Sequence, residues 1–155
     1  MIHTFTIDFL GRPHTMNDER QAHHFTSAKI RREWKEATIK MCVVTRAPRG
    51  LERIGVLIQP IYTKGNLPDP DASAPTAKAI LDGLVTGKTK GQPGYGVVPD
   101  DCGKHVAYVC LMAPIKDPSC NPGVRVTIIE RTNDAEELPA LGCQARLPEP
   151  QGTVS

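Results

Sequence analysis

Four segments of the chain have the pattern of apolar and polar positions that is typical of β-strands. Between residues 2 and 10, Phe5, Ile7 and Phe9 alternate with polar side chains, which predicts a strand with one buried face. Three further runs of apolar and β-branched side chains predict strands at residues 53–62, 105–113 and 123–130. Because proline cannot donate a ladder hydrogen bond, Pro60 is expected at a sheet edge or at a bulge.

A longer period, typical of amphipathic helices, begins at Ser27. Apolar side chains recur there at positions i, i+4, i+7 and i+11, which are Ile30, Trp34, Ala37 and Met41. Either Thr26 or Ser27 is placed to cap the first turn of this helix.

A second helix is predicted at residues 74–86. Its apolar stripe consists of Ala77, Leu81, Leu84 and Val85, with Ile80 beside them. Ser73 is placed to cap this helix, Pro75 is tolerated in its first turn, and Gly87 can end it.

The remaining segments lack a sustained period. Residues 11–26 are expected to form one long polar loop, and the glycine-rich residues after 86 a flexible loop that leads to the third strand. We therefore predict an α/β (α+β) fold, a small single-domain sandwich with two main helices on a mixed β-sheet, in the order β-α-β-α-β-β. The domain spans residues 1–131, and residues 132–155 form a Pro-rich acidic tail that we expect to be mobile.

Composition narrows the class of protein. A chain of 155 residues is long enough for one domain with a core. It contains no run of about 18 apolar residues and no signal-peptide pattern, so we expect a cytoplasmic protein with no membrane partner. Its five cysteines are widely spaced and include no Cys-x-x-Cys pair, which favours reduced thiols over a disulfide scaffold or a zinc ribbon.

Charge is distributed unevenly along the chain. Residues 130–155 hold five acids and two bases, a net charge of −3. Because the whole chain carries +2, residues 1–129 carry +5. On the first predicted helix, five basic residues are offset only by Glu33 and Glu36; they are Lys29, Arg31, Arg32, Lys35 and Lys40. This face is either a solvated helix surface or a surface that contacts phosphates.

The most distinctive charged residues lie around the second helix. Asp69 and Asp71 end the loop before it, Lys78 and Asp82 lie four residues apart on its polar stripe, and Asp100 and Asp101 precede the next strand. Hard divalent cations such as Mg²⁺ bind clusters of carboxylate oxygens, and a nearby lysine can stabilise charge on a phosphate. The alternative is ordinary turn chemistry around Asp-Pro-Asp and Pro-Asp-Asp.

Other familiar patterns fit less well. Gly87-Lys88-Thr89 resembles the end of a Walker A loop, but Gly83 and Gly87 are separated by three residues instead of four. The segment also follows a predicted helix, whereas a Walker A loop precedes one. His23 and His24 are adjacent and have no identifiable partner for a metal. A restriction-enzyme type of site would need an acidic residue two places before its lysine, and neither Lys78 nor Lys104 has one there.

In order along the chain, these charged residues resemble the RusA-like Holliday-junction resolvases. The segment Gly11-Arg-Pro-His-Thr-Met-Asn17 is similar to the opening Gly-x-Pro-x-Ser-x-Asn signature of that family. The Asp69-x-Asp71 pair, the Lys78 to Leu84 run and Asp100-Asp101 follow in the family's order. The resemblance covers residues 5 to about 130.

The resemblance implies a homodimeric endonuclease, dependent on Mg²⁺ (with Mn²⁺ able to substitute), that cuts four-way DNA junctions. It is compatible with a protein encoded by a phage or prophage in a bacterial cell. It implies that Asp69, Asp71 and Asp101 are catalytic metal ligands, with Asp100 adjacent, that Lys78 is the essential lysine, and that Asp82 supports it. Basic and polar side chains that would contact the DNA backbone are Arg12, Asn17, Arg20, Lys29, Arg31, Arg32, Lys35, Lys88 and Lys90.

Two departures leave alternatives open. Ala72 replaces the family's asparagine, and six residues instead of three separate Asp71 from Lys78. Either the loop bulges and returns Asp69 and Asp71 to the metal, or one of them is no longer a ligand. The segment from Val85 to Pro99 is also longer than expected. An inactive junction-binding or regulatory protein of the same fold, and a small structural or interaction protein, therefore remain as alternatives.

Overall fold

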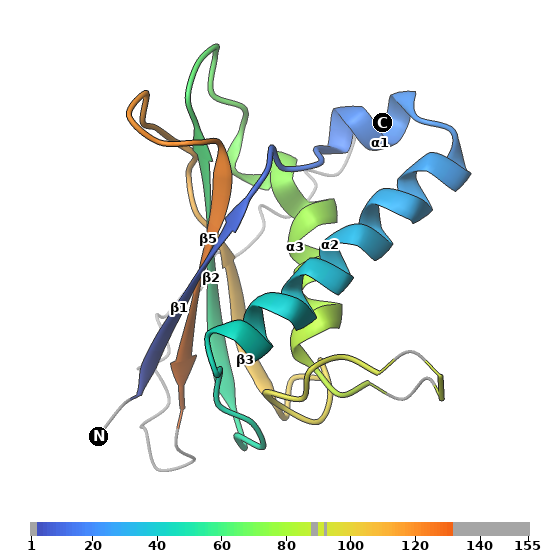
Figure 1. Cartoon of the computed structure of the whole chain (residues 1–155), viewed down its shortest axis with the longest axis vertical. Coiled ribbons are helices and arrows are strands. Elements are labelled where there is room, and N and C mark those ends of the chain that lie inside the picture. Colours follow the sequence, from blue (N-terminus) through green and yellow to red (C-terminus); the bar gives the residue numbers. More distant parts are fainter. Residues whose placement is uncertain (1–2, 88–89, 92, 132–155) are drawn as a thin grey trace, which may run out of the picture.

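The computed structural model describes residues 3–87, 90–91 and 93–131. They form two layers, a mixed β-sheet and a pair of helices that cover one of its faces (Figure 1). The strands are β1 (Thr4–Leu10), β2 (Ile54–Tyr62), β3 (Val106–Leu111), β4 (Ile115–Lys116) and β5 (Gly123–Glu130), and the helices are α1 (Met16–Gln21), α2 (His24–Val44), the 3-10 helix η1 (Pro70–Ser73) and α3 (Ala74–Leu84). The predicted mixed α+β fold is confirmed.

Long-range pairing places β2 inside the sheet. The strand order is β1-β5-β2-β3, with β5 antiparallel to both β1 and β2, while β3 and the short β4 run parallel to β2. In β1, Ile7 and Phe9 are buried and Phe5 is partly buried, while the alternating polar residues are exposed, as the period of two predicts.

Pro60 lies in an interior strand, at a break in the pairing. The carbonyl groups of Ile58 and Tyr62 accept hydrogen bonds from Met112 and Asp117, so the backbone of Pro60 also faces the β3–β4 side. β3 pairs with β2 as far as Ile58, and β4 resumes the pairing at Ile61. The missing N–H of Pro60 therefore lies at this gap in the pairing, where no partner strand needs a hydrogen-bond donor. Locally the position resembles a sheet edge, one of the two places expected for this proline.

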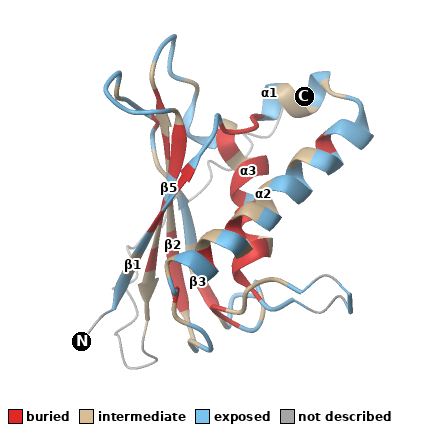
Figure 2. Cartoon of the chain, viewed as in Figure 1, coloured by how far each residue is buried: buried red, intermediate tan, exposed pale blue. Residues whose placement is uncertain are grey.

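α3 is the central helix of the second layer. Its apolar side chains pack on the helix-facing side chains of β2, which are Ile54, Val56 and Ile58. Ile80 and Leu84 have no exposed surface, and each contributes roughly 1.5–3 kcal/mol by this burial. Figure 2 shows α3 largely buried, whereas α2 buries only the side that faces α3 and the sheet.

The loop predicted at residues 11–26 is wrong, because it contains α1 and the start of α2. α1 begins at a capping box in which the hydroxyl of Thr15 accepts from the amide of Asp18, and the carboxylate of Asp18 accepts from the amide of Thr15. α1 has no buried residue, so no apolar period marked it in the sequence.

The predicted cap of α2 is also wrong. The helix begins at His24 instead of near Ser27, and its N-cap is His23, whose Nδ1 accepts from the amide of Phe25 at 3.4 Å. The carbonyl of His23 accepts from the amides of Thr26 and Ser27, so both hydroxyl residues lie inside the first turn. Histidine is not among the residues that usually cap helices, which is why the sequence pattern favoured its neighbours.

α3 ends close to its expected position, but Ser73 makes no side-chain capping hydrogen bond although it occupies the N-cap. The segment after α3, expected to be flexible, is fixed over residues 94–98. Val97 and Val98 are buried, and the amides of Tyr95 and Val97 donate to the carbonyls of Gly83 and Leu84 at the end of α3.

Some expectations concern parts of the chain that are not described. The acidic tail at residues 132–155, the thiol of Cys143 and the side chain of Lys88 lie outside the described residues. Within the described ranges the cysteines are free thiols, at positions 42, 102, 110 and 120. None of the helices described is long and apolar enough to cross a membrane.

Candidate functional site

Lys78 is the centre of the charged cluster that the structure forms. Its Nζ lies 2.5 Å from Oδ2 of Asp101 and 2.8 Å from Oδ1 of Asp82. Asp82 is one turn away on α3, so the helix alone explains that pair. Asp101 comes from the loop before β3, and only the tertiary fold brings it to Lys78.

The segment before Asp101 is anchored in the core. Val98 is fully buried and forms an isolated parallel bridge with Val85, just after α3. The amide of Thr86 donates to the carbonyl of Val98, which holds the chain at the end of α3 three residues before Asp101. The carboxylate of Asp100 accepts from the amide of Asp101 at 2.9 Å and fixes the last turn.

The cluster is open to solvent, and its lysine is charged. Hydrogen bonds to Asp101 and then Asp82 raise the pKa of Lys78, against partial burial, which acts in the opposite direction. The side chains of Lys78, Asp82 and Asp101 are 56%, 43% and 38% exposed. Exposed pairs of this kind add less than about 1 kcal/mol to stability, so the fold does not depend on them.

Asp69 and Asp71 lie just before the start of α3. Asp69 is the N-cap of η1 and makes no side-chain capping bond, while Asp71 lies within η1, and both are exposed. The cluster around Lys78 begins one helical turn into α3. In the described structure the carboxylates that form ion pairs with Lys78 are those of Asp82 and Asp101, not those of Asp69 and Asp71. Their predicted role as metal ligands stays a prediction.

The carboxylates of the described residues are not grouped as a divalent cation requires. Mg²⁺ binds several oxygen ligands in near-octahedral geometry. Among residues 3–87, 90–91 and 93–131, no group of three or more His, Cys, Asp or Glu side chains is placed to hold a metal ion. The carboxylates of Asp82 and Asp101 converge on the ammonium group of Lys78 instead. In this arrangement the ammonium group of Lys78 occupies the space between the two carboxylates, and the predicted role of Mg²⁺ stays a prediction.

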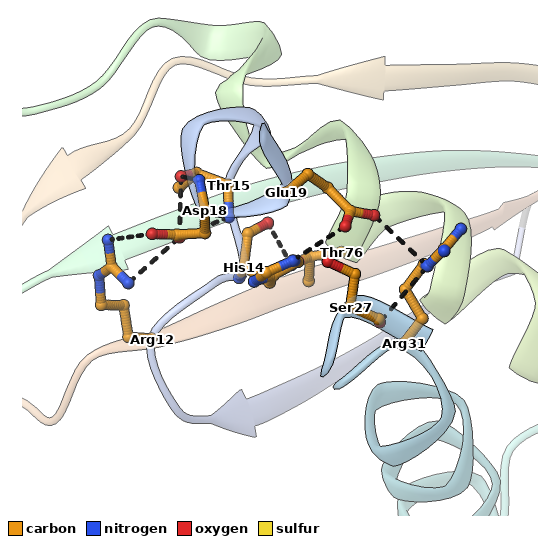
Figure 3. Close-up of polar contacts among 8 residues, drawn as sticks. All are labelled: Arg12, His14, Thr15, Asp18, Glu19, Ser27, Arg31 and Thr76. Carbon is orange, nitrogen blue, oxygen red and sulfur yellow. Dashed lines mark hydrogen bonds and ion pairs between the residues drawn. The ribbon is translucent and has the colours of Figure 1, made fainter. Parts of the chain in front are cut away.

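A second polar cluster, shown in Figure 3, joins the segment after β1 to α3. The hydroxyl of Thr76 accepts from the amide of His14 at 2.8 Å and donates to its carbonyl at 2.9 Å. Thr76 is buried on α3, two residues before Lys78. These two bonds hold the Gly11–Asn17 segment against the helix that carries the lysine.

Glu19 connects this segment to α2. Its Oε2 lies 3.3 Å from Nε2 of His14, which is buried, and its Oε1 lies 3.4 Å from Nε of Arg31 (Figure 3). The nearby hydroxyl of Ser27 contributes most to lowering the pKa of Glu19, followed by the bond from His14 and the charge of Arg31, while burial opposes them. The carboxylate is therefore ionised at neutral pH and orients the guanidinium of Arg31.

The basic residues predicted to contact DNA differ in their surroundings. Arg12 pairs with Asp18 at 3.2 Å, and Lys29 with Glu33 at 3.9 Å. Arg20 and Arg31 lie close to Lys78, where they line the same pocket. The other described members are Asn17 on α1, Arg32 and Lys35 on α2, and Lys90 in the loop after α3.

The sequence did not reveal four participants in these clusters, namely His14, Glu19, Ser27 and Thr76. The one local signal was Thr15-x-x-Asp18, which has the form of a helix start and would have predicted α1 with Glu19 on it. The bond between His14 and Thr76 spans 62 residues, and no local pattern encodes such a distance.

Comparison with known proteins adds no relative. No model of a protein family, no curated protein and no solved structure matches the chain.

Proposed function

We propose that this protein is a structure-selective DNA endonuclease, dependent on Mg²⁺ and similar to the RusA-like resolvases, which cuts four-way junctions as a homodimer. The observation that carries the proposal is the contact between Lys78 and Asp101. The resemblance assigns both residues to one site, and they lie 2.5 Å apart although 23 positions separate them in the sequence. The Mg²⁺ requirement, the cut and the dimer rest on the resemblance alone.

The residues of the site suggest roles that need no further group. Lys78 is an exposed cation held in place by two carboxylates, so it is oriented toward solvent before a ligand arrives. A phosphate oxygen that approaches Lys78 would exchange with one of these carboxylates for its N–H donors. Charge on that oxygen would then be stabilised without reorganisation of the helix.

The decisive experiment is cleavage of a synthetic four-way junction in Mg²⁺, with linear duplex of the same sequence as control. We expect the wild type to cut the junction and Asp101→Asn to lose at least about a hundredfold in rate, typical for removal of a group that acts in the transition state. Asp117→Asn is a matched control, because Asp117 is a partly exposed aspartate in the turn after β4 whose carboxylate accepts from Ser119 instead of Lys78. An intact junction, or equal cutting by Asp101→Asn, would contradict the proposal.

A second function is favoured by the position of Asp69 and Asp71. Because these carboxylates do not join Asp101 in the described structure, a protein of this kind could bind junctions without cutting them. Binding of the junction in EDTA, with no nicking after addition of Mg²⁺ or Mn²⁺, would favour this junction-binding protein over the endonuclease. Absence of any binding to branched DNA at low salt would exclude both.

A further inference from the structure

A pocket of about 550 Å³ opens where α1, α2 and α3 meet, beside the Lys78 cluster. This volume is within the roughly 300–1,000 Å³ typical of ligand sites. Lys78 lines the pocket and also contacts Asp82 and Asp101, so it separates the pocket from these two carboxylates. The pocket is therefore distinct from the charged cluster and adjacent to it.

Positive charge dominates the walls of the pocket. Arg20, Arg31 and Lys78 line it, and Glu19 is the one acidic side chain among its lining residues. Both oxygens of Glu19 face donors, Nε2 of His14 and Nε of Arg31. The bond to Glu19 uses Nε of Arg31, which leaves the terminal Nη groups of the guanidinium for a ligand. Among the residues described, Arg20 has no ion pair.

The backbone adds to this charge. His24 and Ser27 in the first turn of α2, and Pro75 in the first turn of α3, line the pocket. α2 has no acidic residue in its first turn, so the partial positive charge of its N-terminus is uncompensated by its own side chains.

A buried hydroxyl in the wall, that of Ser27, lies near Glu19 without a hydrogen bond of ordinary geometry to any described residue. Ser27 is 3% exposed. A ligand oxygen that enters the pocket would supply an acceptor after a small rotation of this side chain.

We propose that this pocket binds a phosphate of the DNA backbone next to the phosphate that approaches Lys78. Arg20 and Arg31 bind its oxygens from two sides, while Glu19, held by His14, orients Arg31. This inference rests on the proposed function for the identity of the ligand. The pocket itself is a phosphate site whether or not the protein cuts DNA.

The first test uses inorganic phosphate and needs no nuclease activity. Amide resonances of the full-length protein are followed by NMR as phosphate is added, with chloride at equal ionic strength as reference. We expect saturable shifts at His24 and Ser27, and about tenfold weaker binding in Arg20→Gln, the effect of losing one charged hydrogen bond. Lys64→Gln, which removes one exposed positive charge in the turn after β2 and does not line the pocket, should bind phosphate as the wild type does.

Shifts that do not saturate, or equal affinities in Arg20→Gln and Lys64→Gln, would overturn the phosphate site. The second test measures binding of a four-way junction in EDTA over a range of salt concentrations. Arg20→Gln should weaken binding and reduce the salt slope by about one ion, as expected for a lost phosphate contact. If Arg20→Gln weakens phosphate binding but leaves junction binding unchanged, the assignment of the ligand to DNA is overturned. If the wild type binds phosphate and the junction but does not cut the junction in Mg²⁺, only the proposed nuclease is overturned.

Discussion

Replacement of Gly83 by alanine tests how closely α2 and α3 pack, and this packing positions Lys78 and the pocket. Gly83 is a buried residue of α3 that faces α2. A Cβ at this position would lie 2.6 Å from Cβ of Thr38 and 2.9 Å from the backbone oxygen of Lys35. Neither atom is the end of a flexible side chain, so relief requires the two helices to move apart.

Two effects of opposite sign decide the result. Alanine is better than glycine in a helix interior by about 1 kcal/mol. Overpacking of a tight core site costs about 1–3 kcal/mol and sometimes more. Because both neighbouring atoms are part of or next to the backbone of α2, the upper part of this range applies. We expect Gly83→Ala to lower the free energy of unfolding by about 1–2 kcal/mol.

The assay is urea denaturation followed by the fluorescence of Trp34, the single tryptophan, which packs against the core on α2. Gly103→Ala is the matched control, since a Cβ there meets nothing within 4 Å, and its effect should stay within about 0.5 kcal/mol. Adding Thr38→Ser to Gly83→Ala removes Cγ2, which lies 2.9 Å from the new Cβ, and should recover part of the loss. A Gly83→Ala protein as stable as the wild type would refute the close packing of the two helices.

Three other predictions concern titration, thiols and the central lysine. The pKa of Glu19 is lowered, so its ionised form stabilises the fold above the ordinary pKa of 4.5, and this contribution is lost as pH falls through the lower folded pKa. In urea denaturation, Glu19→Gln should therefore be less stable than the wild type by about 1 kcal/mol at pH 7 and equally stable in acid. A stability difference that does not change with pH would contradict the argument. Burial raises the pKa of Cys42 to about 11, with the charge of Arg49 opposing it. Iodoacetamide at pH 8, with the products read by mass spectrometry, should label the exposed Cys110 in the native protein and label Cys42 only after unfolding. Equal labelling of the two thiols in the native protein would contradict the burial of Cys42. Because the ion pairs of Lys78 are exposed, Lys78→Met should change the free energy of unfolding by less than about 1 kcal/mol. The same substitution should abolish junction cleavage. A large loss of stability would show that the lysine is structural.

The chain's own pattern determined its main elements. Alternation at Phe5, Ile7 and Phe9, and the helical stripe that includes Ile80 and Leu84, lie within stretches of a few residues, where the backbone period alone decides which side chains share a face. β1, β2, β3, β5, α2 and α3 follow from such local patterns. The i, i+4 pair of Lys78 and Asp82 was also readable, because one helical turn fixes it.

Where a local pattern was weak, prediction failed. α1 buries none of its residues, so its capping box was its one signal, and it was taken for part of a loop. Val97 and Val98 lie in a glycine-rich stretch without a period, and their burial depends on hydrogen bonds to the end of α3. Such segments take their conformation from the elements already packed beside them.

The site shows the same division between sequence and tertiary structure. The sequence supplied the charged residues, and the resemblance to one family grouped them, but their separation in space was decided by the fold. α3 extends away from η1, so Asp69 and Asp71 stay at its start, while the buried anchor at Val98 brings Asp101 to Lys78. Contacts over 23 and 62 residues depend on how helices pack on the sheet, because the free energy of that packing is spread over the whole core and no local run of residues contains it.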